Sequence, residues 1–74
     1  MNIHNNDYQW IAHLDPDVQL EAFRRLTVYL SSRDLVHVMQ QVESGKSVFE
    51  AHRETGLIAR YYVQLLRILD EVEE

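Results

Sequence analysis

Two arginines and a glutamine recur in the last part of the 74-residue sequence at the spacing of one helix face. Arg60, Gln64 and Arg67 are separated by four and then by three residues, so a helix would bring them close together on adjacent turns. Arginine can donate two hydrogen bonds to a guanine edge, and glutamine can bond an adenine edge, in the major groove of DNA. A solvated helix face has the same spacing, so the pattern leaves both interpretations open.

Other residues in this part of the chain could contact a phosphate backbone. Lys46 and Ser47 stand at the expected start of a helix, where backbone N–H groups and a lysine favour anions. Because helix neighbours point about 100° apart, we expect Tyr62 in the core and the Tyr61 hydroxyl near the surface, within reach of a phosphate. The alternative is that both tyrosines only pack. The complete set of candidate DNA-binding residues is Lys46, Ser47, Arg53, Arg60, Tyr61, Gln64 and Arg67.

The residue types argue against a metal site and against catalysis. The chain has no cysteine, and its histidines are His4, His13, His37 and His52. No pair of them has the spacing of a helical metal site. Ser44–Ser47 resembles the end of a phosphate-binding loop, but Gln40 replaces the required earlier glycine. We predict no catalytic residue, no metal ligand and no cofactor, and expect His52 to pack with one ring nitrogen hydrogen-bonded.

Composition and apolar spacing predict an all-α fold of four to five short helices. Two glycines and one proline are too few for the many tight turns of an all-β domain. The single domain is expected to begin with a frayed segment over 1–7 and a short helix within Tyr8–Leu14. Asp15-Pro16 is a typical helix start, and the helix that it begins is expected to end near Leu30.

Serines and glycines mark the later helices. Ser31-Ser32 interrupts the chain, and Ser32 is expected to cap a helix that reaches Val42 and is closed by Gly45 in the left-handed conformation.

A capping box formed by Ser47 and Glu50 starts a third, short helix. Gly56 is expected to end this helix. Leu57-Ile58 then connects it to a last helix over about 59–72, with a solvated acidic tail over 70–74.

The apolar residues exceed what one buried stripe per helix uses. The expected inward residues are Leu20, Phe23, Leu26, Leu30, Leu35, Val38, Met39, Val42, Tyr62, Leu65, Leu66 and Leu69. Four further apolar residues have no place in these buried stripes, namely Trp10, Val28, Tyr29 and Val36. Because so short a chain has a small core and no disulfide, we predict a homodimer or larger oligomer formed through residues 8–42. The aromatic patch Tyr8, Trp10, Ile11 and Leu14 either packs on a second chain or caps the core.

The segment from Gly45 onward has the helix-turn-helix pattern, which a plain helical hairpin shares. With Gly56 as the turn glycine, the buried positions are Ala51, Leu57, Tyr62 and Leu65. His52 and Thr55 occupy positions where small and apolar residues are usual.

Particular residues resemble those of the PapB-type regulators of fimbrial adhesin operons, over residues 32–69. The matching residues are Gly45–Ala51, the pair Tyr61-Tyr62, and Leu66. The run Glu50–Gly56 is also similar to plasmid-repressor and resolvase-type helix-turn-helices. Both resemblances imply binding to double-stranded DNA, and the first implies a bacterial transcription regulator. The chain departs from the pattern in its acidity and in having no segment for a wing after the last helix.

Charge is distributed unevenly along the chain. The net charge is −5, yet residues 44–69 contain four basic and two acidic residues. A locally basic module within an acidic protein fits specific DNA binding by oligomers. The acidic flanks also fit a different class of function, an interaction protein that binds another regulatory protein rather than DNA. With no membrane-length apolar run and no signal peptide pattern, we expect a cytoplasmic protein.

Overall fold

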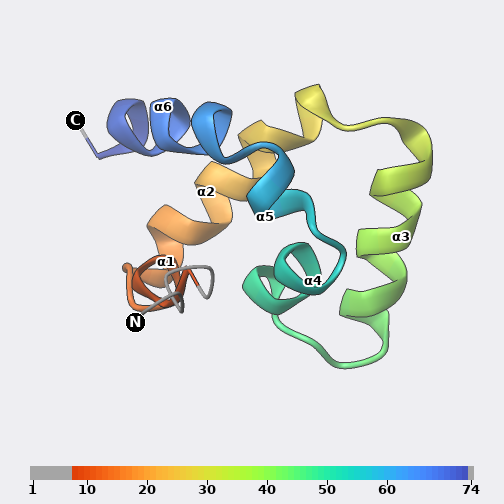
Figure 1. Ribbon diagram of the computed structural model, residues 1–74. Helices are drawn as coiled ribbons and strands as arrows, with labels where there is room; N and C mark the ends of the chain where they lie inside the picture. The colour runs from red at the N-terminus through yellow and green to blue at the C-terminus, as the bar shows by residue number, and fades with distance from the viewer. Residues whose placement is uncertain (1–7, 74) are drawn as a thin grey trace, which may run out of the picture.

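The computed structural model describes residues 8–73, and their regular structure is entirely helical (Figure 1). This confirms the all-α prediction, with six α-helices in the described part of the chain rather than four or five. The predicted fraying of residues 1–7 lies outside the described residues. The helices are α1 (Gln9–Ala12), α2 (Pro16–Leu26), α3 (Ser32–Glu43), α4 (Val48–Glu54), α5 (Leu57–Arg60) and α6 (Tyr62–Val72).

Helix α2 begins where the sequence predicts and ends earlier. Asp15 is the N-cap, its carboxylate accepts a hydrogen bond of 2.8 Å from the Asp17 N–H, and Pro16 is the first helical residue. The α-helix stops at Leu26 and continues as one 3-10 turn over Thr27–Tyr29. The predicted end near Leu30 was therefore one turn too late.

Helix α3 is capped by Ser31, one residue before the predicted Ser32. Ser31 is extended, and its hydroxyl oxygen accepts from the Asp34 N–H at 3.2 Å. Gly45 closes the helix at φ +109°. There the Gly45 N–H donates to the Val42 carbonyl and the Lys46 N–H donates to the Gln41 carbonyl, which satisfies two terminal carbonyls.

Helix α4 starts at the predicted capping serine. The Ser47 hydroxyl oxygen accepts from the Glu50 N–H at 3.1 Å. The hydrogen bonds of the described residues include no return bond from the Glu50 carboxylate, so only one half of the box forms. Gly56 follows the helix at φ +78°.

The last part of the chain differs from the prediction of a single helix over 59–72. Leu57-Ile58 is not a connection, because both residues belong to α5. Tyr61, at φ −112° and ψ 29°, separates α5 from α6. Asp70 and Glu71 lie in the last turn of α6, and they and Glu73 are exposed, as the prediction of a solvated acidic end requires.

The core lies where α6 crosses α2, with α4 and α5 packed beside them (Figure 1). Four residues that we predicted to point inward are exposed instead: Leu20, Met39, Val42 and Leu66. Ile68 is buried in place of Leu66, because α6 turns its 65, 68 and 69 positions toward α2. No helix of the described chain is long and apolar enough to cross a membrane.

Candidate nucleic-acid interface

The turn between α4 and α5 is built on a fully buried apolar contact. Ala51 and Leu57, on either side of Gly56, and Leu65 in α6 have no exposed surface. Tyr62, the fourth position of the predicted pattern, is half-buried. The packing therefore fixes how α5 leaves α4, and a helix-turn-helix and a helical hairpin would both bury these positions.

The two residues that depart from the usual pattern each form a hydrogen bond to a backbone carbonyl of α4. The His52 ring is buried, and its Nδ1 lies 2.8 Å from the Val48 carbonyl oxygen. The Thr55 hydroxyl donates to the Ala51 carbonyl at 2.8 Å. Because each group bonds to its own helix, these polar residues can occupy positions that are normally small or apolar.

The predicted arginine–glutamine face is present only in part. Arg60 and Arg67 are exposed, whereas Gln64 is half-buried, and Val63 lies exposed between the arginines. The break at Tyr61 places Arg60 on α5, whereas Gln64 and Arg67 lie on α6. Arg60 Nη1 also contacts Asp34 Oδ2 of α3 at 3.2 Å.

The other cationic candidates contact groups of their own chain. Lys46 forms an ion pair with Glu54. The Arg53 guanidinium lies 5.5 Å from the centre of the Phe49 ring, a cation–π contact. All of these are surface contacts, which typically contribute about 0–1 kcal/mol, so an incoming phosphate could replace them.

Both residues of the tyrosine pair pack partly against the core. Tyr61 and Tyr62 are both half-buried, so Tyr62 is less buried than the expected core residue, and Tyr61 keeps part of its surface exposed. The Tyr62 ring lies 5.0 Å from Tyr8 and 6.4 Å from Trp10, measured between ring centres. With Ile11 fully buried, the N-terminal aromatic patch packs on α6 of its own chain, although Trp10 remains 44% exposed.

The remaining arginines differ in how many acidic side chains they contact. Glu21 accepts hydrogen bonds from both Arg24 and Arg25, and these bonds lower its pKa to about 2. Arg25 also lies 3.8 Å from Glu71. Within residues 8–73, Arg33, Arg53 and Arg67 form no ion pair, and Arg53 has the cation–π contact with Phe49.

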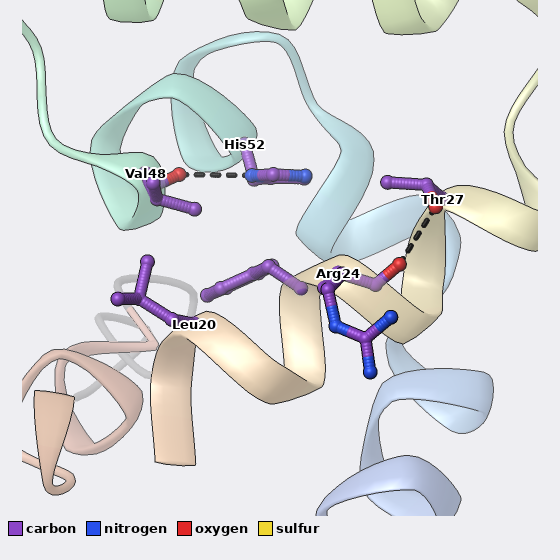
Figure 2. A pocket seen from close by; sticks show the side chains of 6 residues that line it. Leu20, Arg24, Thr27, Val48 and His52 are labelled. Atoms are coloured by element: carbon purple, nitrogen blue, oxygen red, sulfur yellow. Dashed lines mark hydrogen bonds between the residues drawn. The ribbon is translucent and has the colours of Figure 1, made fainter. Parts of the chain in front are cut away.

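A shallow pocket of about 320 Å³ lies between α2 and α4 (Figure 2). Its lining residues are Leu20, Phe23, Arg24, Thr27, Val48 and His52. Apart from Arg24 and the His52 ring, the walls are mostly apolar, so the pocket suits an apolar group. The sequence did not indicate it, because its two walls are more than twenty residues apart and Leu20 was expected in the core.

His52 is the buried titratable group of this pocket. Burial lowers its pKa, and Nε2 has no hydrogen-bond partner. Since the Val48 carbonyl can only accept, Nδ1 carries a hydrogen and donates it to that carbonyl. The predicted packed histidine with one satisfied nitrogen is thus confirmed.

Metal-ligating side chains do not cluster in the described residues. No group of three histidine, aspartate or glutamate side chains there could hold an ion, and His4 lies outside that range. Comparison of the chain with known protein families, with curated proteins and with solved structures gave no match.

Proposed function

We propose that this chain is a small transcription regulator of the bacterial cytoplasm that binds double-stranded DNA through α5 and the first turns of α6. The observation that carries the proposal is the pair Arg60 and Arg67, which are exposed on two consecutive helices, while Leu57 of α5 and Leu65 of α6 are fully buried. Specific base contacts require exposed arginines that are held on well-packed elements.

The two arginines have different tasks in this proposal. Arg67 has no ion pair within the described chain, so its guanidinium can reach DNA at no cost in internal contacts. Arg60 must leave Asp34, at 3.2 Å, and that partly exposed pair is weak. We infer that Asp34 competes with DNA for Arg60.

Substitutions at Arg60, Arg67 and Asp34 test the proposal in fluorescence-anisotropy titrations with genomic fragments at several salt concentrations. Arg67→Ala and Arg60→Ala should each weaken binding to the preferred site by about 1–3 kcal/mol, whereas Asp34→Asn should strengthen it. Arg24→Ala is the control, because Arg24 is also exposed, with 72% of its side chain accessible against 57% for Arg60, but is held by Glu21 on α2.

Lys46→Ala tests the phosphate contact separately. Loss of one phosphate contact should weaken all sequences alike and reduce the salt slope by about one. If neither the arginine variants nor Lys46→Ala alters binding while the wild type binds, α5 and α6 do not form the interface.

A second candidate function is binding to another regulatory protein through an apolar surface. The observation that favours it is the number of large apolar side chains left exposed, with Val28 at 82% and Leu20 at 55% exposure. The acidic flanks are the second reason, because negative charge opposes DNA. Absence of DNA retention at micromolar protein and low salt would favour this function over the first.

A further inference from the structure

The outer face of α3 carries exposed apolar residues among polar ones in its centre and has a charged residue at each end. Helix α3 lies at one edge of the molecule and packs mainly on α4 (Figure 1). Of its twelve residues only Val38 is buried. Val36, on the opposite side of the helix, is 53% exposed, and Met39, about 100° round the helix from Val38, is 58% exposed.

Arg33 and Glu43 lie at opposite ends of this outer face. Arg33 is in the first turn of α3 and Glu43 is its last residue. The helix dipole favours acids at the N-terminus and bases at the C-terminus, so both charges are on the unfavourable end for α3 itself. Neither forms an ion pair within residues 8–73, so contacts within the described chain do not explain their placement.

This arrangement is complementary to itself. In two antiparallel copies of α3 related by a twofold axis near residue 38, position 33 of one helix faces position 43 of the other. Arg33 would then meet Glu43 of the partner subunit at both ends, about 15 Å from each other along the helix. Val36, Met39 and Gln40 would fill the centre, as an isologous interface requires.

We propose that the outer face of α3 is the homodimer interface of this protein. Its occupant is a second copy of α3, running antiparallel, and the charge complementarity of Arg33 and Glu43 selects that orientation over the parallel one. Asp34 and Arg60 lie on the other side of α3, so the dimer leaves them free. The proposal does not depend on DNA binding.

The small contact predicts a weak dimer. A helix of twelve residues is about 18 Å long and offers less than the roughly 800 Å² per partner of a standard interface. Sedimentation equilibrium from low micromolar to near-millimolar protein should therefore show a concentration-dependent monomer–dimer equilibrium. A chain that stays monomeric over that whole range would overturn the proposal.

A pair of matched valine substitutions tests the location. Val36 and Val63 are similarly exposed, at 53% and 59%, and both lie within helices. Val36→Glu should raise the dimer dissociation constant at least tenfold, and Val63→Glu on α6 should leave it unchanged. Equal effects of the two substitutions would place the interface elsewhere. Thermal melting of each variant shows that it is folded at the assay temperature.

Charge reversal tests the orientation. Arg33→Glu and Glu43→Arg should each weaken the dimer at least fivefold, because each puts like charges at both ends. The double variant, and an equal mixture of the two single variants, should restore association to near the wild-type constant. In a parallel dimer, position 33 would face position 33 and position 43 would face position 43, so each single change would leave like charges opposed and association unchanged. Unchanged association in the single variants would therefore disprove the antiparallel pairing. So would a double variant that does not restore association.

Discussion

The imidazole of His52 stacks on the ring of Phe23, with ring centres 4.3 Å apart and planes inclined by 26°. This contact joins α4 to α2 across the pocket that Figure 2 shows. His52 is only 3% exposed, and its Nε2 has no partner. A proton at Nε2 would therefore place an unsolvated charge between the two helices, and burial lowers the pKa of His52 for that reason.

Stability should consequently fall on mild acidification. A folded-state pKa below the ordinary value of 6.5 means that the unfolded chain takes up the proton first. The His52 contribution is therefore complete above pH 6.5 and declines as the pH falls below it. Urea denaturation between pH 8 and pH 5.5 measures this. In His52→Phe the decline over that interval should be smaller, and an unchanged decline would show that His52 is not its cause.

Alanine substitutions of Ser31 and Ser32 should lower the free energy of unfolding by different amounts, although the two serines are adjacent and both exposed. Ser31→Ala removes the acceptor for the Asp34 N–H and should lower the free energy of unfolding by about 1 kcal/mol. Ser32→Ala, inside the first turn of α3, should change it by less than about 0.5 kcal/mol. For a chain of this size the first change corresponds to a shift of roughly 4–8 °C in Tm. A reversed order would place the cap at Ser32.

Gly56 should be sensitive to substitution for conformational reasons alone. A Cβ atom at this position would meet nothing within 4 Å, but the residue has φ +78°. Gly56→Ala should therefore cost about 1–2 kcal/mol of folding free energy, and Gly56→Asn should cost less, because asparagine adopts the left-handed region more readily. Thermal denaturation of the two variants would contradict this explanation if asparagine were the more destabilising residue.

Leu65 and Leu66 are neighbours with opposite environments. Leu65 has no exposed surface and Leu66 is 40% exposed. Leu65→Ala should lower the unfolding free energy by about 2–5 kcal/mol, which is comparable with the whole stability of so small a domain. Leu66→Ala should lower the unfolding free energy by less than about half of the loss in Leu65→Ala, because part of its side chain is already in contact with water. Circular dichroism melts distinguish the two, and similar losses would mean that α6 faces α2 in a different register.

The sequence by itself determined the features that depend on neighbouring residues. Asp15-Pro16 starts α2, Ser47 starts α4, and Gly45 and Gly56 take positive φ after α3 and α4. Each of these is decided by a side chain or a missing Cβ within a few residues of the backbone that it controls. The all-α class follows from the same local signals.

The tertiary structure alone decided which apolar face each helix buries. Periodicity offered Leu65 and Leu66 equally, and only the crossing of α6 over α2 selects Leu65 and Ile68. The same applies to Met39 on α3, which lies at the molecular edge and is exposed. It applies also to the contact of Arg60 with Asp34, which are 26 residues apart. Burial and long-range pairing depend on how complete helices pack, and the spacing within one helix carries no information about its neighbour.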